Sequence, residues 1–127
     1  MPSLDGTFAV TGEAGGIGAA CIDAIRKAGG SPVSIDRVEH PVCPSLIADV
    51  ADEADLAPAL ARIGPLAGLI FVAGTNARGR VEDLPWEEWR RVMAVNVRGM
   101  MLALKHARLS DGAGVVLTSS VSGPYRL

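Results

Sequence analysis

The sequence predicts an α/β fold, a doubly wound parallel sheet with the strand order 3-2-1-4-5. Short apolar runs bounded by Gly, Pro or Asp alternate with longer stretches of helical period, which is the pattern of βαβ units. Hydrophobic residues make up 49% of the 127 residues and aromatic residues only 4%, so we expect a core of small aliphatic side chains. Right-handed crossovers give the strand order and place ligand sites at the carboxyl ends of the strands.

Each expected strand is a short apolar run that ends at a turn-forming residue. The strands are expected at residues 7–11, 32–36, 45–50, 69–73 and 115–119. Because domains of about 100 to 150 residues are the commonest, we interpret residues 1–127 as one domain.

Two helices are expected between the first four strands. Apolar residues recur at helical spacing over 16–28, and Gly29 supplies a stop. A second helix is expected over 52–63, with Asp52 as its N-cap. Pro58 lies inside this range, so we expect a short or kinked helix.

The longest helix is expected over 86–108, before the fifth strand. It follows Pro85, and proline suits the first position of a helix. One face of this helix is expected to carry Trp89, Met93, Asn96, Met100, Ala103 and Ala107.

The charge balance argues against polyanionic partners. There are 12 basic and 14 acidic residues, a formal net charge of -2, so we expect no binding to nucleic acid or to membranes. The chain shows neither a secretory signal at its start nor an apolar run long enough for a membrane span, so we expect a soluble, cytoplasmic protein. Two cysteines and two histidines lack metal-ligand spacing, and we expect no metal site.

The segment TGEAGGIG at 11–18 follows the first strand and opens onto a helix. Free N–H groups, the positive end of a helix dipole and the absence of Cβ atoms suit a bound pyrophosphate. A tight turn with no ligand is the alternative for a glycine cluster of this kind.

With its TGxxxGIG spacing, this segment resembles the classical short-chain dehydrogenase/reductase family. The resemblance implies a Rossmann-type sheet, NAD(P) as cofactor and hydride transfer between nicotinamide and a carbonyl or alcohol carbon. It further implies that Gly12, Gly16 and Gly18 line the diphosphate turn and that Ile17 offers a backbone contact. Gly15 occupies a position where many NADP-preferring relatives carry a basic residue, which favours NAD.

Asp36 ends the second strand, where an acidic side chain hydrogen-bonds the adenosine ribose and repels a 2′-phosphate. The expected cofactor is therefore NAD rather than NADP. Arg37 follows it and could soften this preference by pairing with a phosphate. As the alternative, Asp36 only caps a turn.

Two further matches follow the third and fourth strands. By the resemblance, Asp49 and Val50 contact the adenine edge and ring, although such a pair also forms ordinary strand-end turns. Ala73 and Gly74 resemble the end of the family's NNAG element and leave room for the cofactor. Phe71 and Val72 replace both Asn residues of that element.

The resemblance implies two catalytic residues. Asn96 lies in an NVRG segment that matches the family's NVxG and implies a role in proton relay; the alternative is a polar mid-helix residue. Ser120 lies in an SSVSG segment that matches SSxxG, where the serine polarises the substrate carbonyl; serines at strand ends also form turns. The five matches occur in the family's order along the chain.

The family's catalytic Tyr and Lys form a YxxxK segment after the serine. Tyr125 lies too close to Ser120 to be that tyrosine, and no lysine follows it. We therefore expect a truncated, clipped or partly observed polypeptide that stops before the family's last strands.

Two functions remain open at this point. The first is an NAD-dependent oxidoreductase of this family that acts on a small carbonyl or alcohol substrate, with activity of the 127-residue chain alone left open. The second is a catalytically silent nucleotide-binding or interaction module. A misfolded remnant that binds no ligand is the remaining alternative and has no function. The resemblance also allows a homo-oligomer through the helix at 86–108.

Overall fold

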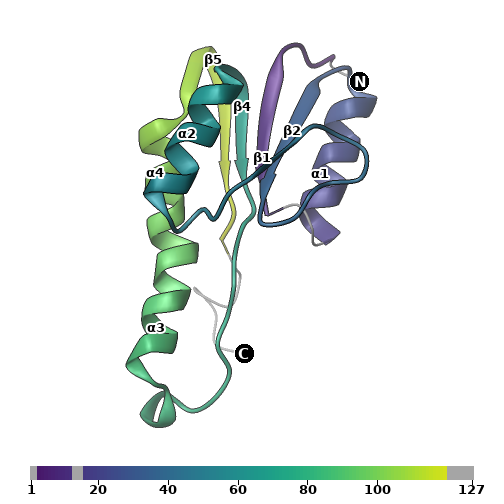
Figure 1. Cartoon of the computed structure of the whole chain (residues 1–127). Helices are drawn as coiled ribbons and strands as arrows, with labels where there is room; N and C mark the ends of the chain where they lie inside the picture. Colours follow the sequence, from purple (N-terminus) through teal and green to yellow (C-terminus); the bar gives the residue numbers. More distant parts are fainter. Residues whose placement is uncertain (1–2, 13–15, 120–127) are drawn as a thin grey trace.

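β1 (Thr7–Thr11) lies in the middle of a five-stranded sheet with the order β3-β2-β1-β4-β5 (Figure 1). Residues 3–12 and 16–119 are described by the computed structural model. The remaining strands are β2 (Ser31–Asp36), β3 (Ser45–Ile47), β4 (Pro65–Phe71) and β5 (Arg108–Leu117). All neighbouring strands are parallel, so the predicted fold class and strand order are confirmed.

β3 and β4 differ from the predicted bounds. β3 ends at Ile47 rather than Val50, because the chain turns at Asp49: its carboxylate accepts from Ala51 N at 2.9 Å, and its carbonyl accepts from Asp52 N at 3.1 Å. β4 spans Pro65–Phe71 rather than 69–73: it starts earlier because Pro65 and Leu66 pair with β5, and proline is tolerated at the first residue of a strand.

β5 is longer at its start than predicted and lies at the edge of the sheet. The polar and glycine-rich residues before Val115 belong to β5 because they pair with the start of β4. The register of this pairing shifts between Leu66 and Gly68. Within the described part of the chain β5 pairs with β4 alone, and its side chains are almost all exposed.

The first two helices lie where the sequence placed them. α1 (Gly16–Lys27) connects β1 to β2, and α2 (Glu53–Ile63) connects β3 to β4. Asp52 is the N-cap of α2, as predicted, and its side chain accepts from Ala54 N at 3.0 Å. The helix continues past Pro58 to Ile63 and is not cut short there.

The predicted long helix is continuous but not uniform. It consists of α3 (Trp86–Met93), a π-helical stretch η2 (Ala94–Arg98) and α4 (Gly99–His106), and a short 3-10 helix, η1 (Val81–Asp83), precedes it. Pro85 immediately precedes the first helical residue instead of occupying it, and the helix ends at His106 rather than Arg108.

Helices cover both faces of the sheet, with α1 on one face and α2 and α4 on the other, while α3 extends beyond the carboxyl ends of the strands (Figure 1). Alternate residues of a strand serve the two faces. In β1, Ala9 belongs to the core beneath α2 and α4, whereas Val10 packs with Ile22 and Ile25 of α1. The larger core consists of Ala9, Ile35, Ala48, Val50, Leu56, Ala59, Leu60, Leu66, Leu69, Phe71, Leu102 and Ala103.

The described residues contain neither a membrane-spanning helix nor a cluster of metal ligands. No helix among them has the length and apolar character that a membrane crossing requires. The described His, Cys, Asp and Glu side chains form no group of three or more that could hold a metal ion.

Candidate functional site

A cavity of about 620 Å³ opens at the carboxyl ends of β1, β2 and β4 and beside the turn that follows β3. Its volume lies within the range of about 300 to 1,000 Å³ that is typical of small-molecule sites. Residues predicted to bind the cofactor line it: Gly12, Gly16, Ile17, Gly18, Asp36, Arg37, Asp49, Val50, Ala73 and Gly74. Gly15 and Ser120 lie outside the described residues. The structure thus brings the residues predicted to bind the cofactor together around this cavity. That they bind a cofactor stays a prediction.

Gly12 lies where β1 and β4 end side by side. Its φ is +73°, and a Cβ at this position would lie 2.3 Å from Cα of Ala73. Only glycine fits both conditions, because L-residues rarely adopt positive φ and no real Cβ approaches a backbone atom this closely. Gly12 therefore allows the two strands to form a continuous floor for the cavity.

The N-terminus of α1 faces the cavity through Gly16, Ile17 and Gly18. Among the described residues nothing lies within 4 Å of a Cβ built on Gly16, so their side chains leave this helix end uncrowded. The first turn of α1 carries no acidic residue. The first N–H groups of α1, which have no partner within the helix, and the positive end of its dipole suit an anion in the cavity.

Asp36 and Arg37 lie at the end of β2 and border the same cavity. One carboxylate oxygen of Asp36 accepts the backbone N–H of Arg37 at 2.6 Å. Asp36 is half-buried, whereas Arg37 is exposed. Asp36 thus makes a local contact at the end of β2 and also lines the cavity, and both of its predicted roles stay predictions.

Asp49 has two roles in the local backbone. Its Oδ1 accepts from Ala51 N at 2.9 Å, and its own N–H donates to the carboxylate of Asp55 at 2.7 Å. The strand-end turn that was the alternative reading is thus also formed. Val50 is buried and packs close to Gly99 of the long helix, where a Cβ would lie 3.2 Å from a Val50 methyl group.

The end of β4 keeps its hydrogen bonds without the two Asn residues of the NNAG element. Thr11 is fully buried, and its hydroxyl accepts from Val72 N at 3.2 Å. The Phe71 carbonyl accepts from Thr118 N at 3.1 Å, and the Phe71 side chain is fully buried in the core. The end of β4 is therefore hydrogen-bonded to β1 on one side and to the residue after β5 on the other. Phe71 packs in the core, whereas an Asn at this position would make polar contacts.

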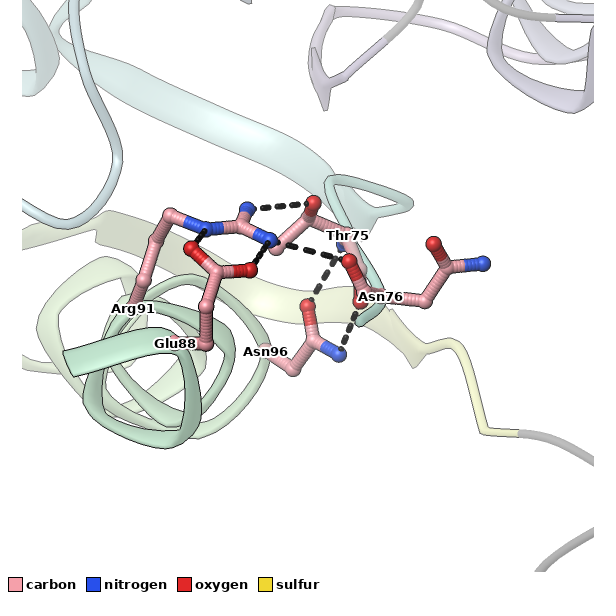
Figure 2. A network of polar contacts seen from close by, with 5 residues as sticks. All are labelled: Thr75, Asn76, Glu88, Arg91 and Asn96. Carbon is pink, nitrogen blue, oxygen red and sulfur yellow. Dashed lines mark hydrogen bonds and ion pairs between the residues drawn. The ribbon is translucent and has the colours of Figure 1, made fainter. Parts of the chain in front are cut away.

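Asn96 lies in the π-helical stretch η2 and contacts the segment that follows β4 (Figure 2). Its Oδ1 accepts from Thr75 N at 2.8 Å, and its Nδ2 donates to Thr75 O at 2.8 Å. Both backbone groups of one residue are thus bonded by one side-chain amide. Asn96 is thus a polar residue within the helix, as the alternative had it, but its amide joins the helix to the segment after β4 instead of only facing solvent. Its role in proton relay stays a prediction.

The same segment is held by Arg91 from the preceding helical turns (Figure 2). Its guanidinium donates to Thr75 Oγ1 at 2.8 Å and to Asn76 O at 2.9 Å, and it forms a two-point ion pair with Glu88. The hydrogen bond from Arg91 lowers the pKa of Glu88, and Glu88 raises the pKa of Arg91.

The sequence profile described as "short chain dehydrogenase" matches residues 7–127. The chain belongs to the short-chain dehydrogenase family. The match covers nearly the whole chain and includes every motif on which the predicted resemblance rested.

Relatives within the short-chain dehydrogenases differ in activity. Galactitol 2-dehydrogenase (L-tagatose-forming) of Cereibacter sphaeroides is 32% identical, with 94% of this chain and 55% of the relative covered. Inactive 2-(S)-hydroxypropyl-CoM dehydrogenase 2 of Xanthobacter autotrophicus is 48% identical over 64 residues, which is 47% of this chain and 28% of the relative.

Among solved structures, the RhlG/NADP active-site complex of Pseudomonas aeruginosa matches with a TM-score of 0.87 at 25% identity. The match covers 98% of this chain and 59% of that one. The chain spans about half the length or less of four curated relatives that it matches, with 28%, 46%, 53% and 55% of them covered.

Sequence reasoning missed several residues that line the cavity of this short-chain dehydrogenase. They are Ile35, Ala48, Ala51, Val72, Thr75, Arg91, Ala94 and Val95. A signal existed for two of them, because Arg91 and Val95 are four residues apart and so share a helix face. Most of the others are apolar, and nothing in their residue types distinguishes cavity lining from core.

Proposed function

We propose that this chain is the NAD(H)-binding part of a short-chain dehydrogenase that transfers a hydride between nicotinamide and a carbonyl or alcohol carbon. The single observation that carries the proposal is the cavity at the carboxyl ends of the strands, which joins the glycine turn to Asp36. Ligands of doubly wound sheets bind at such a position, where neighbouring crossovers leave on opposite faces.

The residues present fit a dinucleotide. Gly12 and the start of α1 leave space and N–H donors for a diphosphate, and no acidic side chain in that first turn opposes it. Asp36 lies one strand away, within the same cavity, and suits a ribose hydroxyl. When bound, the cofactor would supply the hydride donor or acceptor that no amino-acid side chain can replace.

The proposed preference for NAD over NADP depends on charge. The Asp36 carboxylate can accept hydrogen bonds from ribose hydroxyls and would repel a 2′-phosphate. Arg37 is adjacent and exposed, so it offers partial compensation to a phosphate. We therefore propose NAD as the favoured cofactor, with measurable binding of NADP.

Asn96 contributes positioning in this proposal. Its amide bonds the backbone of Thr75, so the side chain fixes the segment after β4. Ser120 is proposed to polarise the substrate carbonyl. The YxxxK residues that move the proton in this family are not among the 127 residues, so the proposal assigns binding to this chain and turnover to a protein that has them.

A catalytically silent nucleotide-binding module is the second candidate. It is favoured by the relative named as inactive, which is 48% identical over the 64 residues that it shares with this chain. Both candidates predict the same cavity and the same ligand contacts, and they differ only in turnover.

Calorimetric titration of the chain with NADH, together with a turnover assay on simple alcohols and ketones, tests the proposal. We expect NADH to bind at the cavity and to raise the unfolding temperature as ligand is added. Binding of NADH without turnover by these 127 residues is expected from both candidates, and the absence of binding excludes both. Turnover by a longer protein that joins this chain to a YxxxK segment supports the dehydrogenase, and binding without turnover by that longer protein supports the silent module.

A further inference from the structure

The segment 74–76 leaves β4 without regular secondary structure and forms one wall of the cavity. Two side chains of the long helix hold it, and both contact Thr75 (Figure 2). Asn96 bonds the backbone of Thr75, whereas Arg91 bonds its hydroxyl and the next carbonyl. The role of Arg91 is not explained by the family motifs, none of which includes it.

The guanidinium of Arg91 has little capacity left for a ligand. An arginine has five N–H donors. Nε and Nη2 bond Glu88, Nη2 also bonds Asn76 O, and Nη1 bonds Thr75 Oγ1. Glu88 balances the positive charge at 3.0 Å. Although Arg91 borders the cavity, its bonds suit holding protein groups better than recognising an anion.

The position of segment 74–76 in the sheet determines which half of a bound dinucleotide it would contact. Asp36 on β2 and Thr75 after β4 lie on opposite sides of β1 in the strand order. With a diphosphate at the β1 turn and the adenosine ribose at Asp36, the other half of the ligand extends toward β4. Thr75 and Arg91 therefore border the nicotinamide half, an argument that rests on the proposed function.

We propose that Arg91 is a positioning residue that holds segment 74–76 in place for the nicotinamide half of the cofactor. The pair with Glu88 fixes the guanidinium on its own helix, and the bonds to Thr75 and Asn76 transmit that position to the cavity wall. Loss of Arg91 leaves the adenosine half of the site intact.

The test compares Arg91→Met with Arg90→Met in the full chain. Arg90 is the matched control, because it is exposed and its ion pair with Glu87 at 3.6 Å lies outside the cavity. Dissociation constants are measured for NADH and for ADP, which lacks the nicotinamide half. We expect Arg91→Met to weaken NADH about tenfold and to change ADP by less than about twofold, with Arg90→Met close to wild type for both.

A second pair of variants separates positioning from general destabilisation. Thr75→Ser keeps the hydroxyl that accepts from Arg91, whereas Thr75→Val removes it at nearly the same volume. Thr75→Val should weaken NADH binding and leave ADP binding unchanged, as Arg91→Met does. Thr75→Ser should bind NADH as tightly as wild type. Equal weakening of NADH and ADP by Arg91→Met, or no change in either, would overturn the inference.

Hydrogen exchange gives a readout that needs no cofactor. The amides of Thr75 and Asn76 should exchange faster in Arg91→Met than in Arg90→Met, because the segment loses two of its bonds to the helix. Unchanged exchange would refute the positioning role. Wild-type protein that binds neither NADH nor ADP would instead refute the proposed function, and the exchange data would still decide whether Arg91 holds the wall.

Discussion

The side-chain amide of Asn96 bonds both backbone groups of Thr75, with N···O distances of 2.8 Å for each bond. Asn96, a residue of the π-helical stretch η2, thereby holds segment 74–76 in place. π-helical insertions often occur at functional sites, since the extra residue shifts side chains around the helix axis. Here the shifted side chain joins the helix to the wall of the cavity.

Replacement of Asn96 by Leu should lower the free energy of unfolding by about 1 to 3 kcal/mol, because two half-buried backbone groups of Thr75 lose their partners. Urea unfolding measures the change. Asn76→Ala is the control, since the Asn76 side chain is exposed and only its carbonyl serves Arg91. Equal stability of the two variants would contradict the structural role of Asn96.

Gly12→Ala should be more damaging than Gly112→Ala. Both glycines have positive φ, +73° and +77°, but only the Cβ at position 12 would meet the backbone of Ala73. Alanine at Gly112 is expected to cost about 1 to 2 kcal/mol from backbone strain. Alanine at Gly12 should cost at least about 1 kcal/mol more, as in other overpacked sites. Thermal unfolding of both variants checks this, and similar losses would show that β1 and β4 can move apart.

Glu53 should make unfolding depend on pH in acid. Its carboxylate accepts from Lys105 at 2.6 Å and contacts His106 at 2.7 Å, and these bonds lower the pKa of Glu53 from 4.5 to about 2. Because the folded pKa is the lower one, the carboxylate stabilises the fold fully above about pH 4.5, and this contribution disappears as the pH falls toward 2.

The stability difference between wild type and Glu53→Gln should therefore shrink through that acid window in urea unfolding curves. In Lys105→Met the window should move up toward pH 4.5, because the largest cause of the lowered pKa of Glu53 is gone. A difference that stays constant with pH would mean that the bridge between α2 and α4 contributes nothing through charge.

Asp36→Asn should shift the proposed cofactor preference toward NADP. The change removes the charge that repels a 2′-phosphate and leaves Arg37 beside it. We expect NADPH to bind about tenfold more tightly relative to NADH than in wild type. Asp23→Asn, at an exposed carboxylate that pairs with Lys27 on α1, should leave the ratio unchanged. An unaltered ratio in Asp36→Asn would remove Asp36 from the ribose site.

The outer face of the long helix presents an apolar stripe at helical spacing. Its exposed members are Trp86, Trp89, Met93, Val97, Met101 and Leu104. We propose that a second copy of this chain covers the stripe. In an antiparallel pair of helices the stripes of the two copies would face each other along their length.

Sedimentation tests this pairing. Wild type should sediment as a dimer at micromolar concentration, and Met101→Glu should sediment as a monomer. Ala20→Glu places the same charge on the exposed side of α1 and should remain dimeric. A monomeric wild type, or a dimer unaffected by Met101→Glu, would contradict the proposal.

The fold could be predicted because its determinants are local. The glycine turn, the Asp52 cap and the apolar runs each specify one element, and right-handed crossovers leave few strand orders. The bounds of β5 could not be predicted, since its polar first half is set by pairing with Leu66 and its neighbours rather than by its own residues. The residues that line the cavity could be predicted where they belong to the motifs of the family, as Gly12, Asp36 and Asp49 do. It was not predictable for Arg91, whose partners Thr75 and Asn76 are 15 or more positions distant.

β5 offers one side of its backbone to the surroundings, and Val115, Val116 and Leu117 are 40%, 55% and 43% exposed. Within the described residues the N–H and C=O groups on that side form no ladder. An apolar edge of this kind accepts an extended peptide as an additional strand. Solubility of the isolated polypeptide should therefore depend on its concentration, and a strand-forming peptide added in trans should keep it in solution.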